Sequence, residues 1–164
     1  RLKKLLKQLA LTLDACPEGV ALSAPQIGVN VRVFAIRADR LASALTEETS
    51  TEAEVANPTT TPNLWYFFNP EINKKSKQQS WLEEGCLSVK DWYGLVRRHQ
   101  KVSLRAWDEH GQTISRNASG LLAQIFQHEL DHLNGELFID KAKELKKISS
   151  EKKSDQSSDQ FNQL

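Results

Sequence analysis

Methionine is absent from this 164-residue sequence, and cysteine occurs only twice, as Cys16 and Cys86. A secreted, disulfide-stabilised domain of this size usually contains more cysteines, so we expect a reducing compartment and predict a cytoplasmic protein; a single disulfide stays open on count alone. No apolar run approaches the ~20 residues that cross a membrane. Because the chain starts at Arg1, it is compatible with a native start further upstream, and the lack of a visible signal peptide carries little weight.

An excess of charge of one sign is also missing. The sequence has 22 basic and 21 acidic residues, which gives a formal net charge of +1. This balance provides no general case for binding nucleic acid or an anionic membrane, and we expect direct contact with neither. The length, with 39% hydrophobic and 26% charged residues, suits one soluble globular domain with a real core.

One motif in this ordinary composition indicates chemistry. Residues 128–132 read H-E-x-x-H, with Glu129 directly after His128. In a helix, positions four apart lie on one face, so His128 and His132 can hold one metal ion, and Glu129 beside them can take a proton from a water molecule on that metal. The alternative is a surface helix that carries two histidines by chance. A hydrolytic site of this kind needs a third protein ligand, which the motif does not supply.

The flanking sequence favours a buried helix over a surface helix. Ser119 is a plausible N-cap, and Asn134 followed by Gly135 is typical of a helix end. Between them, apolar residues recur at three- and four-residue spacing in two lines that flank the histidines. These lines consist of Leu122, Phe126, Leu130 and Leu133, and of Leu121, Ile125, His128 and His132. We therefore expect the histidines to face an interior pocket.

The rest of the chain predicts an N-terminal helix followed mainly by strands. The leucine pattern of residues 1–15 is typical of an amphipathic helix, which we expect to pack on its own domain rather than on a membrane. β-Branched and aromatic residues or clean alternation predict strands at 20–23, 31–39, 64–72, 101–108 and 112–116. Between Pro25 and Gly28 we expect Gln26 on a shaped loop.

Several predictions concern irregular segments. We expect the strand at 64–72 to end at Asn69 and Pro70, with a polar turn over 73–80. Residues 136–140 are interpreted as a short extended segment and 141–147 as a helical stub.

Candidates for the third ligand stay open at this point. Cys86 lies between Gly85 and the apolar Leu87, and a lone cysteine is most often a small buried hydrophobic residue. The other candidates are Cys16, His99, His110 and several carboxylates, although both of these histidines have neighbours typical of exposed positions.

Three separated stretches taken together resemble the signature motifs of the peptide deformylase family. They are GVALSAPQIG at 19–28, EEGCLS at 83–88 and QHELDHLNG at 127–135. The resemblance covers about residues 2–141, apart from an insertion near 46–63. It implies an α+β fold, with antiparallel β-sheets around a central helix that bears the H-E-x-x-H motif.

The resemblance also implies a reaction and a set of site residues. Cys86, His128 and His132 would hold one divalent metal ion, Fe²⁺ in the cell, with Zn²⁺, Ni²⁺ or Co²⁺ as substitutes. Glu129 would carry the proton, and the Gln26 side-chain amide and the Leu87 backbone N–H would donate to the oxyanion. The enzyme would remove the formyl group from the N-terminal formyl-methionine of nascent polypeptides and release formate.

Glu84 and Asp131 flank the implied ligands. The sequence leaves open whether these carboxylates orient the histidines or form local salt bridges and caps.

This sequence departs from the family pattern beside the implied substrate groove. Ala21 stands where the family usually has glycine, Ser23 where it has alanine, Lys90 where it has proline and Tyr93 where it has arginine. These differences motivate two alternatives, which are a divergent metallohydrolase acting on another N-acyl or peptide substrate and a non-catalytic homologue that binds peptides or ribosomes.

The expected organisation is one catalytic metallohydrolase domain over residues 1–143, with a surface insertion at 46–63. Residues 144–164 are polar, and we predict a disordered tail there. We further expect a monomer that acts on N-formylmethionyl nascent peptides, with contact to the ribosome near its exit tunnel as an open question.

Overall fold

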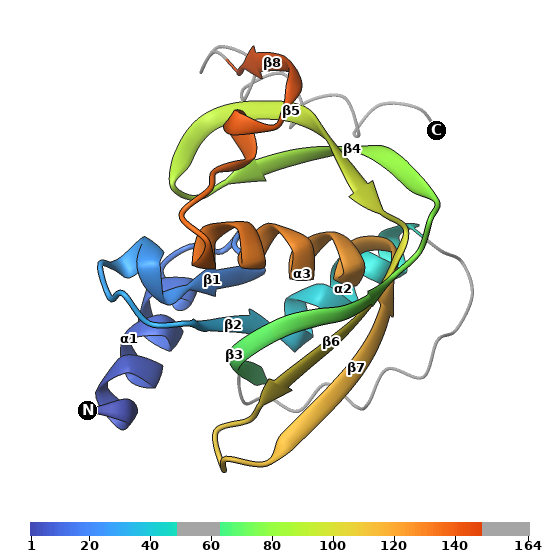
Figure 1. Ribbon diagram of the computed structural model, residues 1–164. Helices are drawn as coiled ribbons and strands as arrows, with labels where there is room; N and C mark the ends of the chain where they lie inside the picture. Colours follow the sequence, from blue (N-terminus) through green and yellow to red (C-terminus); the bar gives the residue numbers. More distant parts are fainter. Residues whose placement is uncertain (49–62, 149–164) are drawn as a thin grey trace, which may run out of the picture.

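The fold was examined in a computed structural model, which describes residues 1–48 and 63–148 (Figure 1). Its helices are α1 (Leu2–Asp14), η1 (Ala24–Ile27), α2 (Ala38–Glu48), α3 (Gly120–Leu133) and η2 (Phe138–Asp140). Its strands are β1 (Ala21–Ser23), β2 (Val33–Arg37), β3 (Leu64–Lys75), β4 (Gln79–Cys86), β5 (Val89–His99), β6 (Lys101–Trp107), β7 (Thr113–Ser119) and β8 (Lys143–Lys147). None of the helices in these two ranges is both long and apolar enough to span a membrane.

Two antiparallel sheets enclose the central helix. The larger sheet has the strand order β1-β2-β3-β6-β7, and the smaller one has the order β4-β5-β8. Every strand pair in both sheets is antiparallel. Helix α3 lies between the sheets (Figure 1). The expected α+β fold with antiparallel sheets around this helix is therefore confirmed.

The main hydrophobic core lies between α3 and the five-stranded sheet. Phe34 on β2 stacks on Phe67 of β3 with 4.8 Å between ring centroids, and Phe126 of α3 meets Phe67 edge-on at 5.3 Å. All three rings are fully buried. Aromatic pairs at such distances add to the free energy gained from burial, so they fix α3 against this sheet.

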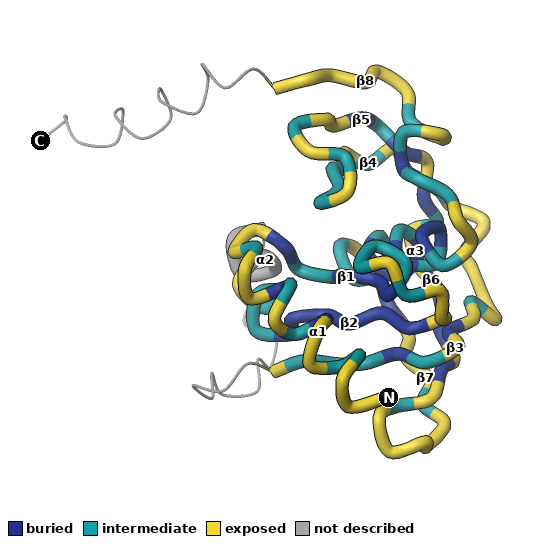
Figure 2. The backbone as a smooth tube through the Cα atoms, turned by 90° about the vertical axis from the view of Figure 1, so that its left-hand side faces the viewer, coloured by how far each residue is buried: buried dark blue, intermediate teal, exposed yellow. Residues whose placement is uncertain are grey.

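Helix α1 covers the opposite face of the same sheet. Its buried residues Leu9 and Leu13 pack with Leu22, Val33 and Ala35. Because both of its faces are covered, β2 is buried along its whole length, whereas β8 is exposed throughout (Figure 2). The expected packing of the N-terminal helix on its own domain is confirmed.

Strand β3 does not end at Asn69 and Pro70. The turn predicted over 73–80 was wrong in its first three residues, which belong to β3, and in its last two, which belong to β4. The strand continues to Lys75 through a register shift between Phe68 and Glu71. Asn69 has a φ of 46° there. A bulge can accommodate a proline, which has no N–H to give to the neighbouring strand, so proline did not end this strand.

Helix α2 replaces part of the predicted strand and of the predicted insertion. The strand expected to reach residue 39 ends at Arg37, and the helix starts at Ala38 and extends to Glu48. Asp39 lies in its first turn, where a negative charge is favourable. Residues 49–62 of the expected insertion lie outside the described residues.

Three C-terminal predictions were also wrong. Residues 136–140 were expected to be extended, but the last three form η2, where the Asp140 carboxylate accepts a hydrogen bond from the backbone N–H of Leu137 at 2.8 Å. Residues 141–147 were expected to form a helical stub, but β8 instead pairs with β5 at the edge of the smaller sheet. The disordered tail was expected to start at residue 144, which is wrong for residues 144–147 because they belong to β8. Beyond residue 148, the expected tail lies outside the described residues.

Candidate metal centre

The fold brings together one residue from the smaller sheet and two from the central helix. Cys86 ends β4, and His128 and His132 lie one turn apart on α3. The Cys86 Sγ atom is 3.1 Å from His132 Nε2, which is 3.1 Å from His128 Nε2. Among the described residues, these three form the one group of at least three Cys, His, Asp or Glu side chains whose ligand atoms all lie within 4.8 Å of one another.

The other candidates for the third ligand are separated from this group. His99 is held by the Ser76 carbonyl oxygen at 2.6 Å, and the His110 side chain is exposed in the turn between β6 and β7. Cys16 lines the same cleft as Cys86 but does not belong to the cluster.

The charges in the cluster suit a cation. Burial alone would raise the pKa of the Cys86 thiol, but hydrogen bonds with His128 and His132 lower it to about 5. Burial alone would lower the pKa of His128, but Cys86 and Glu84 raise it. A thiolate is the form of cysteine that binds metals. Cys86 and Glu84 stabilise a proton on His128 when no metal is bound. A metal ion bound here would replace that proton.

Glu129 is buried directly beside this cluster. It is only 3% exposed, and its Oε2 atom is a buried polar atom without a hydrogen-bond partner in the described part of the chain. Burial raises its pKa to about 7, although the neighbouring histidines oppose the shift. A buried carboxylate oxygen without a hydrogen-bond partner is unusual. Its position beside potential metal ligands provides a base that can exchange a proton near neutral pH.

Gln26 directs its side-chain N–H groups toward the cluster because Ser23 fixes its carbonyl oxygen on the opposite side of the amide. The backbone N–H and the hydroxyl of Ser23 donate to Gln26 Oε1 at 2.8 and 2.7 Å. The Gln26 Nε2 atom donates to Cys86 Sγ at 3.5 Å and to Ser88 Oγ at 3.0 Å. Leu87, whose backbone N–H was the other expected donor, follows Cys86 and lines the same cleft.

Arg98 is a supporting residue that sequence reasoning missed. Its guanidinium forms two hydrogen bonds with Glu84, at 2.7 and 2.9 Å, and a third with Asp131 at 2.7 Å. It is only 4% exposed. The signal was present in β5, where Gly94, Val96 and Arg98 alternate onto the buried face.

Of the two carboxylates flanking the ligands, Glu84 orients a histidine. Its Oε2 atom lies 2.9 Å from His128 Nδ1, which leaves Nε2 of that ring directed at the cluster. Asp131 binds Arg98 and Lys141.

A cleft of about 520 Å³ extends from the cluster to the surface. Three of the four residues that depart from the family pattern, namely Ala21, Lys90 and Tyr93, line it, whereas Ser23 is not among its described lining residues. The cleft also contains Leu121, Ile125 and Val20, which give it an apolar interior.

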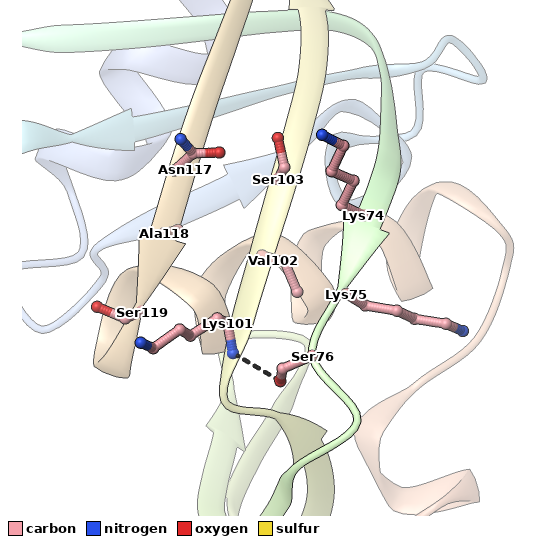
Figure 3. Close-up of a pocket in the computed structure, with 9 residues that line it drawn as sticks. All are labelled: Lys74, Lys75, Ser76, Lys101, Val102, Ser103, Asn117, Ala118 and Ser119. Carbon is pink, nitrogen blue, oxygen red and sulfur yellow. Dashed lines mark hydrogen bonds between the residues drawn. The ribbon is translucent and has the colours of Figure 1, made fainter.

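A second hollow of about 500 Å³ lies elsewhere, over β3, β6 and β7 (Figure 3). It is lined by Lys74, Lys75 and Lys101 with serine and asparagine side chains, and none of its described lining residues is a cysteine, a histidine or a carboxylate. The amines of Lys74 and Lys75 point in different directions (Figure 3). The described part of the chain therefore offers metal ligands of these types in the cleft at Cys86 and not in this hollow.

The fold and the cluster together define a candidate metallohydrolase, and comparisons with known proteins identify its family. A family model described as polypeptide deformylase matches residues 1–148. The chain belongs to the polypeptide deformylase family.

Two relatives show the extent of the similarity. Peptide deformylase 1 of Streptomyces coelicolor is 37% identical over 148 residues, which cover 90% of this chain and 64% of the relative. The peptide deformylase of Mesorhizobium japonicum is 36% identical, with 89% of this chain and 73% of the relative covered. The chain thus spans less than two thirds of the length of the Streptomyces relative.

Solved structures agree with this assignment. The peptide deformylase of Synechococcus elongatus in complex with actinonin matches with a TM-score of 0.67 at 31% identity, over 87% of this chain and 65% of that one. The peptide deformylase of Thermotoga maritima matches with a TM-score of 0.68 at 27% identity, over 87% and 81% of the two chains.

Proposed function

We propose that this chain is a metal-dependent peptide deformylase, which removes the formyl group from the N-terminal formyl-methionine of nascent polypeptides and releases formate. The observation that carries this proposal is the Cys86, His128 and His132 cluster with buried Glu129 beside it, whose Oε2 atom has no hydrogen-bond partner among the described residues. Family membership supports the choice of substrate.

The chain's own residues divide the work of amide hydrolysis between them. Cys86, His128 and His132 would hold a divalent metal ion, which when bound would supply Lewis acidity for a water molecule and a carbonyl group. Glu129 accepts the proton as the water oxygen attacks the formyl carbon, and passes it to the methionine nitrogen as the C–N bond breaks. The Gln26 amide and the Leu87 backbone N–H donate to the oxygen that becomes negative.

We propose Fe²⁺ as the metal in the cell, with Zn²⁺, Ni²⁺ or Co²⁺ able to replace it. A ligand set of one thiolate and two imidazoles accepts each of these ions. Metal analysis of protein purified without oxygen tests the identity of the ion. Recovery of zinc alone from such a preparation would contradict the iron proposal.

The expected partner is the formylated end of a nascent chain, which fits a cytoplasmic monomer acting close to the ribosome. The apolar interior of the cleft suits a methionine side chain. Sedimentation of the full chain, alone and with ribosomes, tests the oligomeric state and this contact.

The deciding experiment measures formate release from a formyl-methionyl peptide by anaerobically purified, iron- or nickel-loaded protein. We expect formate and a free methionine amine. Stoichiometric metal without formate would contradict the proposal. Cleavage of another acyl or internal peptide bond would instead favour the divergent hydrolase motivated by Ala21, Lys90 and Tyr93.

Two variants separate metal binding from turnover. Glu129→Gln keeps the shape and burial of the side chain but removes the base, so we expect bound metal and a loss of at least about 10²-fold in kcat. Cys86→Ala removes a ligand, so we expect loss of metal affinity. Normal turnover by the first variant, or unchanged affinity in the second, would show that these roles belong to other residues.

A further inference from the structure

Arg40 of α2 holds together the turn that forms one wall of the cleft. Its Nη1 atom donates to the backbone carbonyl oxygens of Leu13, Cys16 and Gly19, at 2.9, 2.7 and 2.6 Å. Cys16 and Gly19 line the cleft, whereas Arg40 is not among its described lining residues. The arginine therefore supports this wall from behind.

These hydrogen bonds close a turn that begins at the C-terminal end of α1. The carbonyl oxygen of Leu13 also accepts from the backbone N–H of Cys16 at 3.1 Å, and that of Cys16 accepts from Gly19 at 2.9 Å. Carbonyl groups at the C-terminal end of a helix attract a cation, because the helix dipole is negative there. The guanidinium of Arg40 thus fixes Gly19 relative to both α1 and α2.

Gly19 in turn limits the space open to Leu87. A Cβ atom added to Gly19 would lie 2.9 Å from Leu87 Cδ1, closer than such atoms approach. The Leu87 side chain therefore packs against the backbone of Gly19, beside the apolar cluster that contains Leu13 and Leu22. Leu87 directly follows Cys86, and its backbone N–H is the proposed donor to the oxyanion.

We propose that Arg40 is a positioning residue for the oxyanion donor at Leu87. This inference rests on the proposed function and concerns the same site. The contacts run from Arg40 through Gly19 to the Leu87 side chain, which restrains the backbone of that residue. A donor stabilises a developing charge best when its direction is fixed before the reaction. Without Arg40, the turn loosens and the Leu87 N–H loses its fixed direction.

A double-mutant cycle tests this path. Arg40→Met and Leu87→Ala should each lower kcat for formate release by about three- to tenfold, because complete loss of such a donor costs about 10²–10³-fold. KM and metal affinity should stay within about twofold of the wild type, because the donor acts on the transition state. In protein that already carries Leu87→Ala, Arg40→Met should lower kcat by less than about twofold further, since the two changes act through one contact. An undiminished effect in that background would overturn the inference.

Arg40→Lys tests whether a cationic donor at this position fixes the turn. One nitrogen atom of Arg40 makes all three hydrogen bonds, and a lysine ammonium also offers its N–H donors from one atom. We therefore expect kcat of Arg40→Lys to lie closer to the wild type than to Arg40→Met. Arg105→Met removes an exposed arginine outside the described lining of the cleft and should leave kcat unchanged. No recovery by lysine, or an equal loss in Arg105→Met, would contradict the role given to Arg40.

Methyl relaxation in NMR spectra of zinc-loaded, ¹³C-leucine-labelled protein provides a measurement that needs no turnover. Arg40→Met should lower the order parameter of the Leu87 methyl groups and leave that of Leu104, which is buried in the other core cluster, unchanged. This result without any formate release by the wild type would support the positioning role but contradict the deformylase reaction. An unchanged Leu87 order parameter, with formate released, would overturn the inference and leave the proposed function intact.

Discussion

The two faces of α3 are held by different kinds of interaction. Toward the five-stranded sheet the helix presents Phe126 and Ile125, which lie in a continuous apolar core. Toward the smaller sheet it presents Gln127, His128 and Asp131, which form hydrogen bonds with β4 and β5. The apolar side fixes the helix in the fold, and the polar side fixes the ligands on the helix.

This difference shows why the metal centre lies on the polar side. Apolar packing is non-directional, so it tolerates small shifts of a side chain. Arg98 donates a hydrogen bond to Glu84, and the Glu84 carboxylate lies within hydrogen-bond distance of His128 Nδ1, so the pair sets both the position and the rotation of the His128 ring. A site that must hold three ligand atoms in fixed geometry needs this directional support.

Arg98→Leu should disrupt the polar contacts between α3 and the smaller sheet, and we expect it to lower stability more than the other variants do. The change removes the guanidinium that Glu84 and Asp131 share. It leaves buried Glu84 without its arginine and Asp131 with only Lys141, which costs about 3–5 kcal/mol of unfolding free energy. Urea denaturation measures it. Arg97→Leu is the matched control, because that neighbour is exposed and should change stability by no more than about 0.5 kcal/mol. Equal midpoints for the two variants would contradict the role given to Arg98.

Glu84→Gln should weaken metal binding more than it weakens the fold. The amide keeps the size of the side chain but loses the charge that holds the His128 ring, so we expect about a 10- to 100-fold loss of metal affinity. Competition with a chelator measures the affinity. Glu83→Gln, at the adjacent exposed position, serves as the control, and a similar loss in both variants would refute a specific effect on His128.

Ile36→Val tests the apolar side. Ile36 is fully buried in the core beneath α3, and removal of one methyl group there costs about 0.5–1.5 kcal/mol of stability. Metal affinity should stay at the wild-type value, because the histidine ring is oriented from the other face. A loss of affinity comparable to that of Glu84→Gln would show that the two faces are not independent.

Asp39→Asn should have the smallest effect and should depend on pH. The side-chain hydrogen bond with Arg37 lowers the pKa of Asp39 from its ordinary value. Its stabilising contribution is therefore complete above the unfolded pKa and is lost as the pH falls through the lower folded pKa. The Arg37–Asp39 ion pair is partly exposed. We therefore expect the free energies of unfolding of the wild type and the variant to differ by less than about 1 kcal/mol near pH 7.

Thermal unfolding at pH 7 and below pH 3 measures this difference. The wild type and the variant should converge in acid. If the difference in stability between the wild type and Asp39→Asn persists or increases in acid, the stabilising contribution assigned to the Asp39 carboxylate is wrong.

The sequence contains enough information to predict the central helix and the residues that meet on it. The apolar lines around His128 predicted burial correctly, and the three motifs predicted the meeting of Cys86 with both histidines. These features are local or depend on a shared motif, so a sequence pattern can reveal them.

The burial of Arg98 and the strand at residues 143–147 were missed because both depend on contacts with residues distant in the sequence. Arg98 follows another arginine and precedes a histidine, which suggests an exposed strand end. Its burial becomes favourable only when Glu84 and Asp131 arrive from two other elements. Similarly, the composition of residues 143–147 does not favour a strand, and the free edge of β5 supplies the hydrogen bonds that make it one.

The buried Ser23 has a consequence for the entropy of the reaction. A free glutamine side chain samples many rotamers, and freezing it costs up to about 1.5–2 kcal/mol. With its carbonyl held by both the backbone and the hydroxyl of Ser23, Gln26 loses this freedom when the chain folds. The approaching substrate then meets an amide donor that is already immobile, and no part of its binding free energy is consumed in ordering that side chain.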